Sequence, residues 1–165
     1  MEIERKFEIK ELPADLSSFP CLFIEQAYLC TDPVIRIRRQ DDEFYLTYKG
    51  KGLMAREEYN LPLNRNAYEH LLAKADGNII SKKRFLLPIK QPSFADGYKM
   101  PKEPMKLTIE LDVFNPPFAP LIIAEVEFPD VEMAGAFIPP AWLGKDVTDN
   151  PEYHNSNLSR KVFIH

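Results

Sequence analysis

Charged and apolar residues alternate from the first residues of the chain. Glu2, Glu4 and Lys6 share one parity, whereas Ile3 and Phe7 fall on the other. Successive side chains of a β-strand point to opposite faces, so this stretch predicts a strand with two carboxylates and an ammonium along one face. One such strand is typical of a solvated sheet edge, but the pattern recurs along most of the chain.

The same periodicity predicts about eight strands and a few short helices within a single domain, residues 1–165. Strands are expected at 2–9, 23–29, 34–39, 43–48, 56–63, 79–89, 105–114 and 121–128. Helical turns are expected at 13–19, from Asn64 to about Ala75 with Gly77 just beyond, at 131–137 and at 152–161. Residues 91–104 contain three prolines and a glycine, which predicts a surface loop. Short turns between neighbouring strands favour antiparallel pairing.

Six further predicted strands carry polar or charged pairs at positions i and i+2, with apolar residues on the opposite parity. The pairs are Arg36/Arg38, Thr47/Lys49, Arg56/Glu58, Lys82/Arg84, Glu110/Asp112 and Glu125/Glu127. Two arrangements fit this pattern. The charged faces can look at solvent over an apolar core, or the sheet can close around them while helices cover its apolar outer face.

The distribution of charge favours the closed arrangement, because several strands are purely acidic or purely basic. Like charges at about 4 Å repel by about 4 kcal/mol at an effective dielectric of 20, so six gathered carboxylates would require cations. Mg²⁺ binds carboxylate oxygens while keeping waters and substrate phosphates in its shell. Arginine forks match phosphate oxygens in bidentate fashion. Together these residue types indicate a metal–polyphosphate site.

Net charge and cysteine content exclude several classes of binding partner. The net charge of −4 provides no general attraction to nucleic acid or to an acidic membrane surface. The sequence shows neither a signal peptide nor an apolar stretch of membrane-spanning length. Cys21 and Cys30 are too few for a disulfide framework and are interpreted as buried reduced thiols. We therefore expect a cytoplasmic protein that binds neither nucleic acid nor membrane.

Residues 2–7 resemble the ExExK signature of the CYTH domain, the family of triphosphate tunnel metalloenzymes. The likeness continues in order over nearly the whole chain, which makes it far more specific than an isolated ExExK. It is carried by Gln26-Ala27-Tyr28-Leu29, Arg36-Ile37-Arg38, Thr47-Tyr48-Lys49, Arg56-Glu57-Glu58-Tyr59, Lys82-Lys83-Arg84, Glu110-Leu111-Asp112-Val113-Phe114, Glu125-Val126-Glu127-Phe128, Ala136-Phe137-Ile138-Pro139-Pro140, Val147-Thr148 and Tyr153-His154-Asn155.

The resemblance implies an α+β fold: a closed eight-stranded antiparallel β-barrel, or tunnel, with a charged interior and a few helices packed outside. Such a tunnel binds triphosphate lengthwise and hydrolyses it with Mg²⁺ or Mn²⁺. The implied metal-binding set is Glu2, Glu4, Glu110, Asp112, Glu125 and Glu127, with Glu4 and Glu127 as direct ligands and some of the others holding arginines in place. The implied substrate-binding set is Lys6, Arg36, Arg38, Lys49, Arg56, Lys82 and Arg84.

The resemblance implies that Lys6, Glu4 and Glu127 carry the catalysis. Lys6 could activate the attacking water if neighbouring arginines lowered its pKa, or it could simply bind phosphate. Both interpretations stay open at this stage. Three departures from the family pattern bear on substrate preference: Asn60 replaces a common glutamate, His154 replaces a common tail lysine, and the 91–104 loop is long enough to shape a tunnel mouth.

The expected activity is hydrolysis of inorganic triphosphate, with a triphosphate-containing small molecule as the partner and a homodimer left open. Thiamine triphosphatase, nucleoside triphosphatase and class IV adenylate cyclase are alternatives within the family. A non-catalytic polyphosphate-binding module is an alternative of another class. It would need the basic pairs but would leave the six carboxylates without a role. A barrel for an apolar ligand would need apolar inward faces, which the pattern disfavours.

Overall fold

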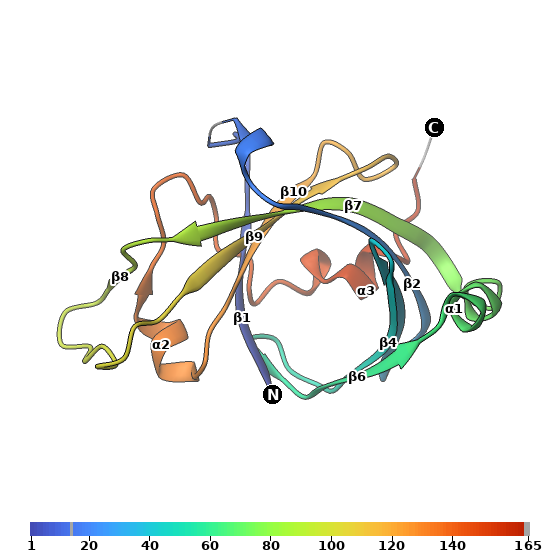
Figure 1. Ribbon diagram of the computed structural model, residues 1–165, viewed down its shortest axis with the longest axis horizontal. Helices are drawn as coiled ribbons and strands as arrows, with labels where there is room; N and C mark the ends of the chain where they lie inside the picture. The colour runs from blue at the N-terminus through green and yellow to red at the C-terminus, as the bar shows by residue number, and fades with distance from the viewer. Residues whose placement is uncertain (14, 164–165) are drawn as a thin grey trace.

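The strands expected from the alternation pair into one antiparallel sheet, which curls into a nearly closed barrel in the computed structural model (Figure 1). The structure describes residues 1–13 and 15–163. The strand order around the barrel is β5-β1-β10-β9-β7-β2-β3-β4-β6. The strands are β1 (Glu2–Glu8), β2 (Cys21–Thr31), β3 (Val34–Gln40), β4 (Glu43–Lys49), β5 (Ala55–Arg56), β6 (Glu58–Leu63), β7 (Asp76–Ile89), β9 (Leu107–Phe114) and β10 (Ile122–Glu127).

One short segment joins the two edges of the sheet. β5 pairs with β1, where Arg56 lies opposite Glu2, and β6 pairs with β4, where Glu58 lies opposite Lys49. The expected strand 56–63 is therefore divided at Glu57, and each part pairs with a different edge of the sheet. This division is why the sheet has nine strands where eight were expected.

The apolar outer face of the barrel is covered on two sides. On one side α2 (Val131–Ala136), with β8 (Ser93–Phe94) and β11 (Phe137–Ile138), encloses a core that includes the fully buried Phe7, Leu111 and Met133. On the other side α1 (Arg65–Leu72) packs Tyr68 against residues of β2 and β3. Asn64 caps α1 as expected, accepting from the Ala67 N–H at 2.7 Å, but the helix ends earlier than predicted, at Leu72. A short 3₁₀ turn, η1 (Leu16–Ser18), follows β1.

The alternation along β1 is confirmed by Arg5, which points outward. Its guanidinium pairs with Asp146 at 2.8 Å and donates to the Phe137 carbonyl at 2.7 Å. Beside it, residues 145–148 run along the end of β1 that β5 does not reach. The Glu8 N–H donates to the Lys145 carbonyl at 2.9 Å, and the Lys6 N–H donates to the Thr148 hydroxyl at 3.0 Å. This strap completes the hydrogen bonding of β1.

The C-terminal segment closes one end of the barrel with η2 (Pro151–Tyr153) and α3 (Asn155–Leu158) (Figure 1). Leu158 packs against Ile80, Phe114 and Ile123, apolar residues that share a parity with the charged interior. As expected, α1 and α2 pack outside, whereas α3 lies against inward-facing residues and makes this end of the tunnel an apolar plug. None of the helices in the described residues is long and apolar enough to cross a bilayer.

Candidate functional site: a charged tunnel

A cavity of about 790 Å³ occupies the interior of the barrel and gathers most of the predicted site. Its wall includes Glu2, Glu4, Lys6, Arg36, Arg38, Lys49, Arg56, Arg84, Glu110, Glu125 and Glu127. The two other predicted residues, Lys82 and Asp112, are buried beside the wall and joined by an ion pair of 2.7 Å. The parity of the strands therefore predicted the inward faces correctly.

The wall formed by β7, β9 and β10 neutralises its own charges. The Arg84 fork binds both carboxylate oxygens of Asp112, at 2.7 and 2.9 Å, and Arg84 also pairs with Glu110. Burial raises the pKa of the Asp112 carboxyl, but Arg84 and Lys82 outweigh burial and hold this pKa below its ordinary value. The same carboxylates raise the pKa of Arg84 well above its ordinary value against the effect of burial.

Lys6 faces this wall from β1. Its Nζ lies 3.6 Å from a Glu125 carboxylate oxygen and donates to the Tyr153 carbonyl of the plug at 3.3 Å. Burial lowers the pKa of Lys6, but Glu125 and Glu4 outweigh it, so that the pKa is raised. This direction is opposite to the one that water activation by Lys6 would need. The electrostatics therefore favour a protonated Lys6 over a water-activating one.

Three arginines on the opposite side of the tunnel are held by neutral groups. Arg38 donates twice to the Gln26 side-chain oxygen, at 2.8 and 2.6 Å, and Arg36 donates to the Thr47 hydroxyl at 3.2 Å. Arg56 donates to the Gly50 carbonyl at 3.2 Å. None of the three forms an ion pair within the described part of the chain. Their charge remains available to an anion.

Glu4 and Glu127 lie directly opposite each other on β1 and β10. Like charges in that relation destabilise a sheet. Burial and then the neighbouring Glu125 raise the pKa of Glu4 to about 7, and partial burial and then Glu58 raise the pKa of Glu127. Neither carboxylate has an ion-pair partner among residues 1–13 and 15–163. These two groups form an excess of negative charge that a cation would relieve.

Glu2 and Glu58 extend the acidic region. Lys49 lies 2.8 Å from Glu2 and 3.8 Å from Glu58, so one ammonium serves two carboxylates. Burial and then the hydrogen bond with Glu58 raise the pKa of Glu2 to about 8. One buried Glu58 oxygen has no hydrogen-bond partner in the described residues. Oxygen donors with too few cations fit a hard divalent ion. In the described chain no three such side chains already cluster closely enough to hold one.

The residues that depart from the family pattern are also placed. His154 lines the cavity from the plug, where burial and then Lys6 lower its pKa to about 4. Asn60 accepts from the Thr47 hydroxyl at 2.6 Å and donates to Glu58 at 3.0 Å, so it joins the wall by hydrogen bonds. The 91–104 loop contributes no residue to the cavity wall; it contains β8, which pairs with β11 on the outside.

Several wall residues were not predicted as site residues. Glu58 lines the cavity and shares the inward parity of Arg56. Thr47 is buried, shares the inward parity of Lys49 and accepts a hydrogen bond from Arg36, so the alternation itself contained the signal for both. Tyr28 and Tyr45, which look like ordinary strand residues in the sequence, also line the cavity. Gln26 carries no charge and gave no signal of its contact with Arg38.

The fold and the wall together define an antiparallel tunnel with one region suited to anions and another suited to cations. A model of the CYTH domain matches residues 1–128, and the chain belongs to this family. Membership of this family of tunnel metalloenzymes implies a divalent metal.

Relatives and a solved structure agree with this assignment. The inorganic triphosphatase of Nitrosomonas europaea is 33% identical over 165 residues and covers 98% of both chains. That of Acetivibrio thermocellus is 33% identical over 167 residues, covering 98% of this chain and 95% of the relative. The crystal structure of an inorganic triphosphatase, 31% identical, superposes with a TM-score of 0.64 over 98% of this chain and 96% of the other.

Proposed function

We propose that this protein hydrolyses inorganic triphosphate to pyrophosphate and phosphate with the help of Mg²⁺ or Mn²⁺. One observation carries the proposal: in the part of the chain that the structure describes, the tunnel combines arginines without carboxylate partners and carboxylates without cation partners. A polyphosphate chain with its metal supplies both missing partners. The activity of the relatives supports the choice of substrate.

The basic residues divide into two groups in this proposal. Arg36, Arg38 and Arg56 bind phosphate oxygens first, because no carboxylate has to be displaced. The other cations contact the chain only after loosening an ion pair. They are Lys6, Lys49, Lys82 and Arg84.

The acidic residues also divide into two groups, by whether they bind Arg84. Glu2, Glu4 and Glu127 would hold the metal, which supplies Lewis-acid stabilisation of phosphoryl oxygens. Glu110, Asp112 and Glu125, predicted as metal ligands, bind Arg84, so we assign them to holding the basic side chains in place.

The chemistry needs little covalent participation by the protein. Water attacks the terminal phosphorus, the bridging P–O bond breaks, and pyrophosphate leaves with the bond electrons. The proton that the water loses goes to the phosphate products or to solvent. Protonated Lys6 and the arginines stabilise the spreading negative charge, and the fixed walls align the chain. The apolar plug restricts water at one end of the tunnel.

The test is a substrate and metal panel. We expect phosphate release from tripolyphosphate with Mg²⁺ or Mn²⁺, and little from ATP or thiamine triphosphate. Glu4→Gln or Glu127→Gln should lower kcat/KM by about 10³-fold or more without changing the circular dichroism spectrum, because each removes a metal-binding charge. Glu103→Gln, in the exposed outer loop, is the matched control.

Two outcomes would contradict the proposal. Formation of cyclic AMP from ATP without phosphate release from tripolyphosphate would indicate a cyclase. Metal-independent binding of tripolyphosphate without turnover would indicate a binding module. Homodimer formation and a cytoplasmic location stay predictions, the first testable by sedimentation.

A further inference from the structure

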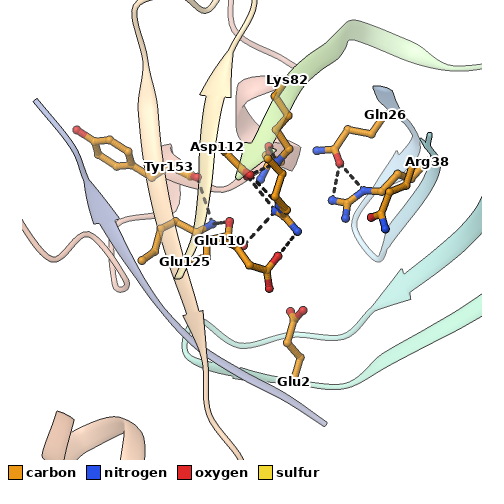
Figure 2. Close-up of polar contacts among 12 residues, drawn as sticks. Glu2, Gln26, Arg38, Lys82, Glu110, Asp112, Glu125 and Tyr153 are labelled. Carbon is orange, nitrogen blue, oxygen red and sulfur yellow. Dashed lines mark hydrogen bonds and ion pairs between the residues drawn. The ribbon is translucent and has the colours of Figure 1, made fainter. Parts of the chain in front are cut away.

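Gln26 on β2 is a fully buried polar side chain that contacts one of the unpaired arginines. Its side-chain oxygen accepts from both Nε and Nη2 of Arg38, at 2.8 and 2.6 Å (Figure 2). The two residues lie opposite each other on β2 and β3, so the backbone register places them in contact. Gln26 itself does not line the cavity, whereas Arg38 does. Gln26 therefore meets a substrate only through Arg38.

Arg84 provides an internal comparison. It uses the same two nitrogens, Nε and Nη2, to bind the carboxylate of Asp112, at 2.7 and 2.9 Å. The guanidinium edge and the distances are similar, and the charge of the partner differs. Asp112 helps raise the pKa of Arg84, whereas burial and then the nearby Arg36 and Arg84 lower the pKa of Arg38.

We propose that Gln26 is a positioning residue that fixes the Arg38 guanidinium while leaving its positive charge free for the phosphate chain. The inference rests on the proposed function, because it assigns that free charge to triphosphate. A glutamate at this position would fit the same space and accept the same two hydrogen bonds. It would also neutralise Arg38 before any substrate arrived.

A buried guanidinium beside a second arginine reduces the stability of the protein without ligand. With an amide at position 26, Arg38 stays charged and the ligand-free protein is less stable. A carboxylate there would neutralise Arg38 and restore that stability. Gln26→Glu should therefore change two properties in opposite directions. The ligand-free protein becomes more stable, and its affinity for triphosphate falls. A residue with a merely structural role would lower stability and binding together.

The test compares Gln26→Glu with Gln26→Met in the full-length protein. For Gln26→Glu we expect Tm without substrate to rise by about 3 °C and KM for tripolyphosphate to rise about 50-fold, with a smaller change in kcat. Gln26→Met removes the hydrogen bonds and should lower Tm while also raising KM. Gln91→Glu adds the same charge in the exposed outer loop and should change neither value.

A double-mutant cycle shows whether Gln26 acts through Arg38. In an Arg38→Gln background, Gln26→Glu should change KM less than twofold. An unchanged KM for Gln26→Glu in an active protein overturns the inference and leaves the proposed function standing. An equal change in KM for Gln26→Glu in the wild-type and Arg38→Gln backgrounds also overturns the inference and leaves the proposed function standing. A wild-type protein that neither binds nor hydrolyses tripolyphosphate overturns both.

Discussion

Two arginines of the tunnel, Arg84 on β7 and Arg38 on β3, are held by the same edge of the guanidinium but by partners of different charge. Asp112 neutralises Arg84, and Gln26 leaves Arg38 charged. The wall around Arg84 is a closed ion-pair network, whereas the wall around Arg38 has unused positive charge. An inward-facing arginine is thus available to an anion only when its anchor is neutral. Arg84 and its carboxylates stabilise the tunnel, whereas Arg38 keeps the charge that we propose binds the substrate.

The largest expected effect is on stability at the neutralised wall. Arg84→Gln leaves Asp112, Glu110 and Glu125 short of a cation in a buried site. We expect a loss of roughly 3–5 kcal/mol in the free energy of unfolding, because breaking a buried ion-pair network leaves uncompensated charge. Urea unfolding without metal measures it. Arg38→Gln, the matched variant on the other wall, should cost less than about 1 kcal/mol, since it removes a charge that has no carboxylate partner. Equal losses for the two variants would contradict the proposed difference between the two walls.

A smaller effect is expected from exchanging the anchor of Arg84. Asp112→Asn keeps the shape of the side chain and gives Arg84 an amide anchor like that of Arg38, while Glu110 and Glu125 still pair with Arg84. The free energy of unfolding should fall by about 2–3 kcal/mol, because Lys82 and Arg84 lose a buried counter-charge. This sign is opposite to the one expected for Gln26→Glu, and urea unfolding of both variants side by side tests it. A change of the same sign in the free energy of unfolding of both variants would show that packing, not charge, determines their stability.

The smallest effect concerns His154, which lines the cavity near Lys6. Its pKa is lowered from 6.5 to about 4 by burial, then Lys6 and Arg56. Between these values the unfolded chain binds a proton that the folded chain does not, so this group lowers stability as the pH falls from 6.5 to 4. His154→Asn should reduce that loss. Tripolyphosphate added without metal should raise the pKa by cancelling the nearby positive charge, which NMR of the imidazole can follow.

The exposed His70 on α1 does not line the cavity and is the internal reference for this measurement. At a fixed pH its imidazole resonances should not move when tripolyphosphate is added. A His154 resonance that titrates near 6.5 in the free protein would instead place this side chain in bulk solvent and remove it from the tunnel wall.

Much of the barrel could be predicted from the alternation alone. A side chain's parity along a strand is a local property, so the inward position of Arg36, Glu110 and their neighbours could be inferred before the strands were paired. The family resemblance then supplied the closure. The partner of each charge could not be inferred in the same way, because it depends on register across the closed sheet. Lys49 meets Glu2, for example, only because β5 and β6 join the two edges.

The plug escaped prediction for a different reason. Leu158 and the residues around it form an ordinary amphipathic tail in the sequence, which would pack equally well on the outer face of the barrel. Ile80, Phe114 and Ile123 share the inward parity but were not distinguished from outer core residues. An apolar residue in a sequence does not show whether its face of the sheet lines the tunnel or packs against a helix. The contact of Gln26 with Arg38 was not predicted, because a neutral side chain gives no charge pattern in the sequence.

The strap at 145–148 limits how far the chain can be truncated from its C-terminal side. The family model ends at residue 128, yet the backbone of Lys6 and Glu8 finds its outer partners at Val147, Thr148 and Lys145. A fragment that stops at Phe128 would leave half of β1 as a bare edge, inviting strands from other molecules to add to it. The smallest unit that can stand alone is therefore longer than the region by which the family is recognised.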